Sequence, residues 1–492
     1  MQPFWFEEEK FKNKIINSDS FVNCTGRKRI SLNGKWNYAF DQYDLFFKQD
    51  WYEEERKKIH ASGENSCYDY SFNHWDTIDI PSTINVKVPE GKFYESTLLF
   101  TRKFDYTPGS DNKVFLRVGA AGYMTAVTLN GKYLGRHEGA STPFMVDITD
   151  KLKRRNRLFL AVDCKRCQDR LPMQLTDWFN YGGVFRDVEL VELPESYIKD
   201  WFVRLKRGSG FGTISADVFL KGAAKGPVTL EIPELGIKTE SEPGKDGKTC
   251  FEFKASPELW CPENPVLYDV LIKWQQDTVK DRIGFREITV KGRDILLNGK
   301  PIWLKGVSQH EESVENGRCL TKEEVKRNFE ILKELNCNYT RLAHYPHNEY
   351  VSELADEKGI LLWEEVPVYW DIMFDNKEVY KDAENQLTEL IIRDRNRASV
   401  IIWSVGNENK DTDERFTFMT GLAKKARELD DSRLVSAACL AQEDKFRDRL
   451  IESLDLIGFN QYYGWYEPTI DPLLNIEKGS MPPKPVIITE TG

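Results

Sequence analysis

The sequence contains no apolar run that approaches the roughly 18 residues needed to span a membrane as a helix. Its opening segment, Met-Gln-Pro-Phe-Trp-Phe-Glu-Glu-Glu-Lys, lacks a basic stretch followed by an apolar one, so no secretory signal is predicted. Lys and Arg never form a long block, and the formal net charge is −10. Because an acidic surface repels phosphate backbones, we expect neither nucleic acid nor a membrane as a partner.

The cysteines are scattered along the chain. They number nine, and this odd count without a regular spacing is typical of a protein from the reducing cytoplasm. Cys164 and Cys167 have the C-x-x-C spacing of redox and zinc sites, but no second C-x-x-C motif or His pair accompanies them. An isolated match of this kind is weak, so the role of these two cysteines stays open. We expect a cytoplasmic protein.

Aromatic residues, in contrast, are abundant. There are 13 Trp, 20 Tyr and 28 Phe, which make up 12% of a chain that is otherwise ordinarily globular, with 40% hydrophobic and 30% charged residues. Flat aromatic faces are surfaces on which sugar rings stack. Aromatic residues are also enriched in the strands of β domains, so a structural explanation is equally open for most of them.

The pattern of apolar residues predicts three domains, which agrees with a length of 492 residues at the rough prior of ~150 residues per domain. Residues 1–195 alternate apolar and polar positions, which predicts a β-sandwich with tight hairpin turns at Asn33-Gly34 and Asn130-Gly131. Residues 196–286 continue this rhythm and suit a small immunoglobulin-like sandwich. In residues 287–492 strands alternate with helices, which predicts a (β/α)₈ barrel.

The barrel sequence begins after a predicted hairpin at Asn298-Gly299. Helical stretches separate its strands, and one of them covers residues 321–335, where Thr321 and Glu324 form a capping box. Seven strand-like runs, one fewer than a complete barrel of this kind contains, occur near 302–309, 339–345, 360–366, 400–407, 434–440, 454–462 and 485–490.

Polar residues follow six of these seven runs, and only the run near 434–440 lacks one. In (β/α)₈ barrels the chemistry gathers at the C-terminal ends of the strands, so a site is expected there. The candidates in chain order are His310, Arg341, His344, Glu364 or Glu365, Asn407, Glu408, Asn460, Tyr462, Tyr466 and Glu490.

Two glutamates stand at the tips of apolar runs: Glu408 ends the run that starts at Val400, and Glu490 ends the run that starts at Pro485. Dehydrating a carboxylate is costly unless the group is used, so we interpret the two as a working pair. Acetal cleavage needs such a pair, because one acid protonates the leaving oxygen while a carboxylate attacks or stabilises the oxocarbenium-like carbon. A separation of about 5–5.5 Å gives retention and one of about 6.5–9.5 Å gives inversion, and the sequence leaves this choice open.

Structural roles are open for several of the candidates. Arg341 can be the ion-pair partner of a strand-end glutamate as readily as a ligand contact. His310 and His344 can be satisfied core histidines, and Tyr462 and Tyr466 can simply pack.

The motifs resemble glycoside hydrolase family 2, and the likeness covers essentially the whole chain. Residues 396–408 are similar to the acid/base signature of the family, with Arg397-Ala398 in place of the usual His-Pro. Further matches are Gly306-Val-Ser-Gln-His310-Glu311, Arg341-Leu-Ala-His344-Tyr-Pro346, Ile487-Ile-Thr-Glu490 and Leu259-Trp260-Cys-Pro262-Glu263-Asn264-Pro265-Val-Leu-Tyr268. The resemblance implies a jelly-roll sugar-binding domain over 1–195, an immunoglobulin-like domain over 196–286 and a TIM-barrel catalytic domain over 287–492.

The same resemblance implies a retaining exo-β-glycosidase with Glu408 as the acid/base and Glu490 as the nucleophile. For this chemistry Glu408 has to be protonated and Glu490 ionised. Asn407 then hydrogen-bonds the sugar 2-hydroxyl. Asp177 is similar to the aspartate that a first-domain loop delivers to the barrel mouth to hold sugar hydroxyls. The other expected substrate contacts are His310, Arg341, His344, Tyr462 and Tyr466.

The resemblance also bears on substrate and cofactor. The segment Asn460-Gln-Tyr462-Tyr-Gly-Trp-Tyr466 looks most like the β-glucuronidase branch, so a glucuronide is narrowly preferred over a galactoside. Galactosidases of the family often place an acidic-x-His metal site after the third strand. Here Glu365 is followed by Val366-Pro367, so we expect no metal and no other cofactor.

The alternative is a non-catalytic or weakly active carbohydrate-binding fragment of such an enzyme. This sequence contains no eighth strand, and a barrel that is incomplete after strand seven leaves unpaired strand edges, which favour self-association. This alternative predicts sugar binding without turnover.

Overall fold

The computed structural model describes residues 11, 14–53, 72, 75–107, 112–223, 225–440, 448–462, 464–466, 469 and 483–491. The chain forms two compact units. Unit 1 contains Met1–Arg170, Gln174–Tyr197 and Glu312–Leu320, and unit 2 contains Leu171–Met173, Ile198–Glu311 and Thr321–Gly492. None of the helices in the described ranges is both long and apolar enough to cross a membrane.

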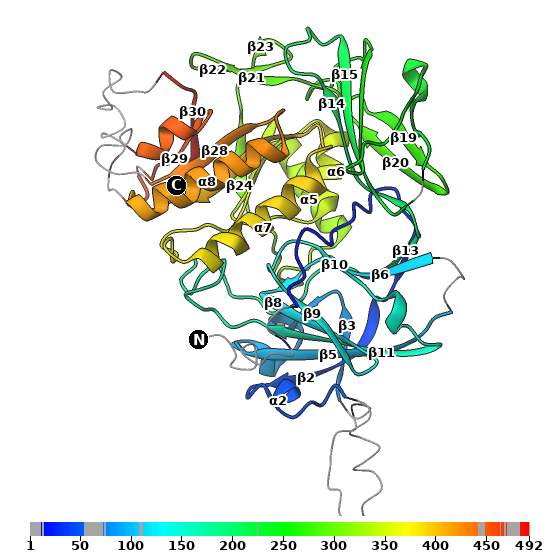
Figure 1. Cartoon of the computed structure of the whole chain (residues 1–492). Coiled ribbons are helices and arrows are strands. Elements are labelled where there is room, and N and C mark those ends of the chain that lie inside the picture. The colour runs from blue at the N-terminus through cyan, green and yellow to red at the C-terminus, as the bar shows by residue number, and fades with distance from the viewer. Residues whose placement is uncertain are drawn as a thin grey trace, which may run out of the picture. The chain divides into compact units, whose positions relative to one another are not determined.

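Unit 1 is built on short strands (Figure 1). Its elements are β1 (Arg29–Ser31), β2 (Gly34–Asp41), α2 (Leu45–Lys48), β3 (Thr77–Ile80), β4 (Ser82–Thr83), α4 (Ile84–Lys87), β5 (Thr97–Asp105), β6 (Asn112–Val118), β7 (Ala121–Gly122), β8 (Met124–Leu129), β9 (Lys132–Glu138), β10 (Phe144–Asp147), β11 (Arg155–Asp163), β12 (Gly183–Val184) and β13 (Val188–Pro194).

These strands form a sandwich, as predicted. One sheet has six strands in the order β3-β2-β5-β11-β8-β9, a second has four in the order β1-β13-β6-β10, and a small third sheet joins β4, β12 and β7. One core cluster draws on both large sheets, with Leu98 and Leu160 from the first and Leu116 and Leu190 from the second. Burying these apolar faces against each other is the main source of stability for the sandwich.

Two of the three predicted Asn-Gly hairpins lie in unit 1, and they have different outcomes. Asn130-Gly131 joins the antiparallel strands β8 and β9, and both residues adopt the positive φ that such a turn requires, 51° and 80°. The prediction for Asn33-Gly34 is wrong, because β1 pairs with β13 whereas β2 pairs with β3 and β5. Here the chain passes from one sheet to the other, and the side chain of Asn33 holds the crossing by accepting from the N–H of Val188 at 3.0 Å.

Residues 312–320 belong to unit 1 although they follow a strand of the barrel sequence. Lys87 Nζ donates to the carbonyl oxygen of Glu315 and to Asn316 Oδ1, both at 2.8 Å. Gly317 has φ +57°, and a Cβ at this position would lie 2.9 Å from side-chain atoms of Thr83 and Tyr181. Glycine therefore allows both the conformation and the close approach of this segment.

The first part of unit 2 is the immunoglobulin-like sandwich that the sequence predicted. Its strands are β14 (Tyr197–Leu205), β15 (Thr213–Lys221), β16 (Val228–Ile232), β17 (Ile237–Ser241), β18 (Lys248–Lys254), β19 (Tyr268–Trp274) and β20 (Asp277–Ile283). They pair in the orders β14-β15-β18 and β17-β16-β19-β20. Buried and exposed positions alternate strictly along β20, as expected of a strand with one face on a core.

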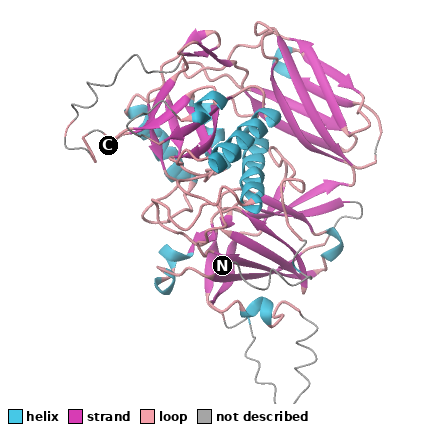
Figure 2. Ribbon diagram, turned by 60° about the vertical axis from the view of Figure 1, so that its left-hand side comes forward, coloured by secondary structure: helices cyan, strands magenta, loops and turns pink. Residues whose placement is uncertain are grey.

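The second part of unit 2 is a parallel barrel that follows a small three-stranded sheet (Figure 2). Its elements are β21 (Ile288–Lys291), β22 (Asp294–Leu297), β23 (Lys300–Pro301), β24 (Gly306–Gln309), α5 (Lys322–Glu334), β25 (Tyr339–Leu342), α6 (Glu349–Lys358), β26 (Leu361–Glu365), α7 (Lys377–Asp394), β27 (Val400–Asn407), α8 (Asp413–Leu429), β28 (Leu434–Cys439), β29 (Ile457–Asn460) and β30 (Val486–Glu490).

The strands β24 to β30 form one seven-stranded parallel sheet in chain order, which confirms the predicted barrel with seven strands. The capping box at Thr321 and Glu324 is present at the start of α5. Every residue of β27 is buried, as expected of a strand covered on both sides. β24 and β30 are the two edges of the sheet, where Val307 and Ile488 are 43% and 53% exposed.

The residues just before β27 tie the barrel to the immunoglobulin-like sandwich inside unit 2. Asn396 accepts from the N–H of Val203 and donates to the carbonyl oxygen of Trp201, each at 2.9 Å. Arg397 is buried and donates to the carboxylate of Asp281 on β20. The N-terminal end of β27, the strand that leads to Glu408, is therefore held in place by hydrogen bonds to the sandwich.

Candidate active site

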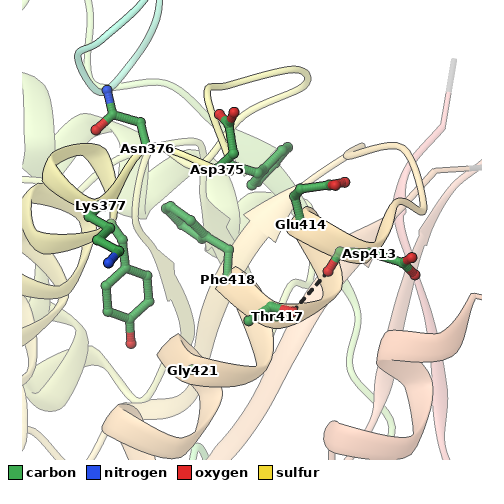
Figure 3. A pocket seen from close by; sticks show the side chains of 10 residues that line it. Asp375, Asn376, Lys377, Asp413, Glu414, Thr417, Phe418 and Gly421 are labelled. Atoms are coloured by element: carbon green, nitrogen blue, oxygen red, sulfur yellow. Dashed lines mark hydrogen bonds between the residues drawn. The ribbon is translucent and has the colours of Figure 1, made fainter.

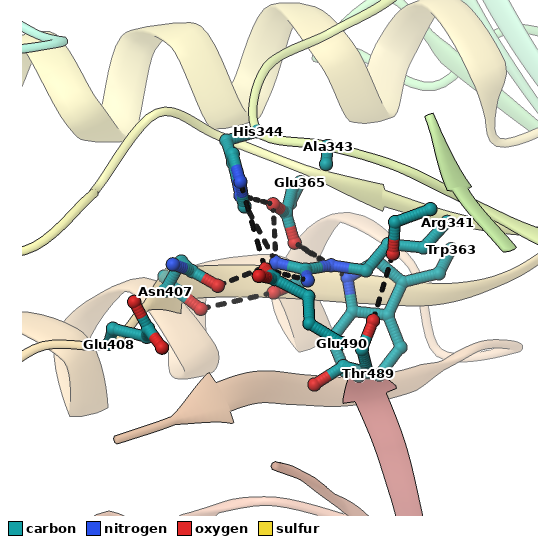
Figure 4. Close-up of polar contacts among 12 residues, drawn as sticks. Arg341, Ala343, His344, Trp363, Glu365, Asn407, Glu408, Thr489 and Glu490 are labelled. Carbon is teal, nitrogen blue, oxygen red and sulfur yellow. Dashed lines mark hydrogen bonds and ion pairs between the residues drawn. The ribbon is translucent and has the colours of Figure 1, made fainter. Parts of the chain in front are cut away.

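The C-terminal ends of the barrel strands bring most of the predicted site residues together (Figure 4). Arg341 lies on β25, Glu365 at the end of β26, and Asn407 at the end of β27 with Glu408 directly after it. Glu490 ends β30. The side chains meet because parallel strands present the same ends to one edge of a sheet.

Arg341 is the hub of this cluster. It is 1% exposed, and it donates to Glu365 Oε2 at 3.0 Å, to Glu365 Oε1 at 2.9 Å and to Glu490 Oε1 at 2.6 Å. It also donates to Asn407 Oδ1 at 2.7 Å. A guanidinium has five N–H donors in a rigid plane and no acceptor, so one residue can hold two carboxylates and an amide in fixed directions.

Glu365 is buried but charged. Burial alone would raise its pKa, but the Arg341 guanidinium and His344 more than offset this and lower the pKa of Glu365 to about 2. Trp363 Nε1 also donates to Glu365 Oε2 at 2.8 Å. Of the two candidates at this strand end, Glu365 is therefore the one that joins the cluster.

Glu364 precedes Glu365 on β26 and points to the opposite face of the sheet, because successive side chains of a strand alternate. Both its carboxyl oxygens are buried, and neither accepts a hydrogen bond from a donor in the described part of the chain. Burial and the nearby Asp394 raise the pKa of Glu364 well above its ordinary 4.5, and Arg393 and Arg433 offset only part of this. A neutral Glu364 can donate to Asp394, whereas an ionised one cannot.

We expect Glu364→Gln to stabilise the protein at neutral and alkaline pH. The folded chain keeps a proton on Glu364 that the unfolded chain loses near pH 4.5. The contribution of Glu364 to the free energy of unfolding is therefore fully present below that pH and falls as the pH rises. The fall is about 1.4 kcal/mol per pH unit until the folded pKa is reached. Glutamine never ionises and still donates to Asp394, so urea unfolding should show a gain that grows with pH.

The matched control is Glu365→Gln on the same strand. Because the pKa of Glu365 is lowered to about 2, this change is expected to reduce stability above about pH 4.5, the opposite sign. A gain for Glu364→Gln that stays constant between about pH 5 and 8 would contradict the buried, protonated carboxyl.

Asn407 has its amide orientation fixed by its neighbours. Arg341 can only donate, so the oxygen Oδ1 of Asn407 has to face it. Asn460 Nδ2 lies 3.3 Å from the same oxygen, and Thr489 Oγ1 in turn donates to Asn460 Oδ1 at 2.7 Å. The amide nitrogen Nδ2 of Asn407 is left buried without a hydrogen-bond partner among the described residues, so it is available to donate to a ligand.

Glu490 is held through both its carboxylate oxygens. Arg341 donates to Oε1, and the hydroxyl of Tyr462 donates to Oε2. Burial and this contact raise the pKa of Tyr462, so the hydroxyl remains a donor at any ordinary pH. Tyr466 is 74% exposed and packs edge-on against Tyr462 at a ring distance of 5.1 Å.

Glu408 lies just beyond β27 in an unusual backbone conformation, with φ +53°. Its N–H donates to the carbonyl oxygen of Ala438 at 2.8 Å. Its carboxyl oxygen Oε2 accepts from Trp370 Nε1 at 2.9 Å. Glu408 therefore contacts a neutral donor, whereas Glu490 contacts a cation.

The remaining predicted residues have different positions. His344 Nδ1 lies 2.8 Å from Glu365 Oε1, and its Nε2 lies 3.7 Å from Glu490 Oε1. His310 Nδ1 lies 3.1 Å from the hydroxyl of Tyr345. Asp177 belongs to unit 1, where it lies exposed in a loop, so its contact with a sugar at the barrel mouth stays a prediction.

Sequence reasoning missed Trp370, Trp363 and Thr489. Trp370 lies in a loop five residues after the end of β26, so counting polar residues at strand tips could not find it. Trp363 and Thr489 sit inside apolar strand runs, where they resemble core residues. The one available signal was the composition of the segment 360–370, which is rich in aromatic residues next to two glutamates.

A cavity of about 590 Å³ lies elsewhere on the barrel, between the first turn of α7 and the N-terminal half of α8 (Figure 3). Its walls include Phe374, Tyr380 and Phe418, with Asp375 and Asp413 at its edge. None of the strand-end residues described above lines it, so it is separate from the carboxylate cluster.

The predicted C-x-x-C motif is not arranged for redox chemistry. Cys164 is fully buried and its thiol donates to the carbonyl oxygen of Ser96 at 2.9 Å. Burial, and next the neighbouring Asp163, raise the pKa of the Cys164 thiol to about 12, so the reactive thiolate is not formed near neutral pH.

The model for the sugar binding domain of glycosyl hydrolases family 2 matches residues 30–194, a second model of the same family matches 196–286, and its TIM barrel domain model matches 288–492. A β-glucuronidase of Streptococcus agalactiae is 27% identical over 525 residues, covering 95% of this chain and 82% of that protein. A β-galactosidase of Clostridium acetobutylicum is also 27% identical, covering 91% of this chain and 53% of that protein.

Among solved structures, the β-glucuronidase from Ruminococcus gnavus in complex with uronic isofagomine is 26% identical. The match covers 97% of this chain and 86% of that one, with a TM-score of 0.83. The chain thus spans about half the length of some curated relatives and about four fifths of others.

Proposed function

Because the chain belongs to glycosyl hydrolases family 2, we propose that it is a retaining exo-β-glycosidase that removes terminal β-linked sugars by double displacement. Glu490 is the nucleophile and Glu408 the acid/base. The proposal extends to the substrate: a terminal β-glucuronide is preferred, and a β-galactoside is the second choice.

The observation that carries this proposal is the contrast between the two glutamates. Arg341 and Tyr462 donate to opposite oxygens of Glu490, which fixes the orientation of its carboxylate and places a cation against it. Glu408 meets only the neutral N–H of Trp370 among the side-chain hydrogen bonds of the described residues. Two carboxyl groups in environments that differ in this way are suited to opposite roles in one reaction.

The reaction follows from these positions. Glu408 gives its proton to the glycosidic oxygen while an oxygen of Glu490 bonds to the anomeric carbon and the bond to the leaving group breaks. Glu408, now a carboxylate, takes a proton from water, which attacks the anomeric carbon and releases the sugar from Glu490. The unpaired Nδ2 of Asn407 donates to the 2-hydroxyl, a contact that strengthens in the transition state.

The choice of sugar rests on the relatives. A β-glucuronidase and a β-galactosidase are equally identical to this chain, at 27%. The similar structure from Ruminococcus gnavus is described as a β-glucuronidase with uronic isofagomine, which favours the uronate. His310, His344 and, as the family resemblance implies, Asp177 are proposed to contact sugar hydroxyls.

The test compares the wild-type chain with Glu408→Gln and Glu490→Gln on aryl β-glucuronide and aryl β-galactoside. Both variants are expected to lose roughly a thousandfold or more in kcat/KM on substrates with poor leaving groups. With an activated aryl glycoside, Glu408→Gln should still accumulate the covalent glycosyl-enzyme, seen as a mass increase, because no acid is needed for departure. Glu490→Gln should not form it.

Glu428→Gln on α8 is the control, because Glu428 is exposed and remote from the strand ends. The reverse pattern, with the covalent species in Glu490→Gln, would exchange the two roles. Sugar binding by the wild-type chain without turnover of either glycoside would favour the carbohydrate-binding fragment instead.

A further inference from the structure

The loop that follows β26 is fastened to the end of β27. The N–H of Trp370 donates to the carbonyl oxygen of Asn407, and the N–H of Asn407 donates to the carbonyl oxygen of Val368, both at 2.9 Å. Asn409 Nδ2 adds a third bond, donating to the carbonyl oxygen of Trp370 at 2.7 Å. These contacts hold the loop backbone at Val368 and Trp370 against Asn407, the residue that precedes Glu408.

Trp370 and Glu408 share a costly conformation. Both have φ +53°, in the left-handed region that residues with a Cβ rarely adopt. Such conformations persist only where the surroundings impose them, and they cluster at functional sites. Here the two residues in this conformation are also hydrogen-bonded to each other through their side chains, at 2.9 Å.

The chemistry of the indole group decides what this bond does. An indole N–H can only donate, so the oxygen that it contacts, Oε2 of Glu408, has to be an acceptor. In a neutral carboxylic acid the carbonyl oxygen is the stronger acceptor, so this bond favours the arrangement in which Oε2 is the carbonyl oxygen and the proton is on Oε1. Tyr369 stacks against the Trp370 ring at 4.7 Å and limits how far the indole can turn.

We propose that Trp370 is a positioning residue for the acid/base: its indole N–H holds Oε2 of Glu408 and so directs the acidic proton to Oε1, where it faces the leaving group. This inference rests on the function proposed above. In the first step the proton moves from Oε1 to the glycosidic oxygen, which also receives the electron pair of the breaking bond to the anomeric carbon. Oε2 keeps its bond to Trp370 throughout.

Trp370→Phe tests this, because phenylalanine keeps an aromatic ring beside Tyr369 and removes the N–H. Substrates with phenyl and 2,4-dinitrophenyl leaving groups on the sugar that the wild-type chain cleaves provide the readout. The phenyl glycoside needs protonation, so its kcat/KM is expected to fall about 10- to 100-fold, within the range that acid catalysis contributes. The 2,4-dinitrophenolate leaving group departs without protonation, so kcat/KM for that glycoside should fall less than about threefold.

Two further variants sharpen the result. Trp303→Phe changes a tryptophan that is 78% exposed and should leave kcat/KM unchanged for both glycosides. Combining Trp370→Phe with Glu408→Gln should cost no more with the phenyl glycoside than Glu408→Gln alone, because the group that Trp370 acts through is already lost.

An equal loss for both leaving groups, or additive losses in the double variant, would overturn the role of Trp370 and leave the proposed glycosidase intact. If the wild-type chain cleaves no β-glycoside, the proposed function fails and this role fails with it. The two failures are therefore distinguished by the wild-type assay.

Discussion

Replacing Arg341 with methionine is expected to lower kcat/KM by at least about a thousandfold and the free energy of unfolding by about 3–5 kcal/mol. Methionine fills much of the same space but leaves Glu365 as a buried carboxylate with its main cationic partner gone. It also frees Glu490 and Asn407 from the group that orients them. Stability and catalysis should therefore fall together, because one guanidinium serves both.

The two losses can be separated by a second substitution. Adding Glu365→Gln to Arg341→Met removes the orphaned charge, so urea unfolding should recover much of the stability while kcat/KM stays low. The pKa of Glu365 is about 2 in the wild type, so its contribution to stability is present above about pH 4.5 and lost as the pH falls toward 2. The stability gap between wild type and Arg341→Met should narrow over the same range.

Arg341→Lys is the informative intermediate. A lysine keeps the charge but not the planar fork that reaches Glu365, Glu490 and Asn407 at once. It should retain more stability than methionine and still lose most of the activity. Wild-type activity in Arg341→Lys would show that charge alone, and not the geometry of the fork, orients Glu490.

Replacing Arg397 with histidine, the residue that the family usually has at this position, is expected to destabilise the protein by about 3–5 kcal/mol. Arg397 is buried, donates to Asp281 and to the carbonyl oxygen of Arg282, and lies 3.7 Å from Asp356 Oδ2. Burial raises the pKa of Asp356, and the Arg397 guanidinium opposes that rise. A neutral, shorter histidine leaves both aspartates without their cation.

The measurement is urea unfolding, with kcat/KM of the folded variant determined alongside it. Arg397 lies a full strand length from Glu408, so kcat/KM should change less than about threefold while stability falls. Arg282→Gln is the matched control, because Arg282 pairs with Glu357 between the same two domains but both side chains are at least half exposed. That pair should contribute no more than about 1 kcal/mol. Equal effects of the two substitutions would show that burial of the Arg397 pair is unimportant.

The sequence was sufficient to predict which strand-end residues share the site, because the strands of a parallel barrel lie side by side in chain order. Glu408, Asn407 and Glu490 could be placed in one site without any contact information, since parallel strands place their C-terminal ends on one edge. The adjacent Glu364 and Glu365 show where this argument stops. The sequence gives no indication of which of two adjacent glutamates at a strand tip faces the barrel interior. Their side chains lie on opposite faces of the sheet, where the pKa of Glu364 is raised and that of Glu365 is lowered.

Other features depended on contacts that lie far apart in sequence. Asn33-Gly34 has the composition of a hairpin, but its strands belong to different sheets, and pairing partners near residues 190 and 80 decide this. The structural role of Arg397, which stands where the family usually has histidine, could not be predicted from the sequence, because its partners Asp281 and Asp356 are 116 and 41 positions away. Trp370 was missed because a neutral donor in a loop has no periodic pattern.

The assignment of residues 312–320 to unit 1 has a consequence for modular exchange. A graft that swapped only residues 1–195 with a relative would remove Lys87, Thr83 and Tyr181 and leave a segment whose close fit at Gly317 was shaped for them. The unit that can be exchanged is thus discontinuous in sequence. The sandwich and residues 312–320 have to be exchanged together, because recombination at residue 195 alone would separate parts that pack against each other.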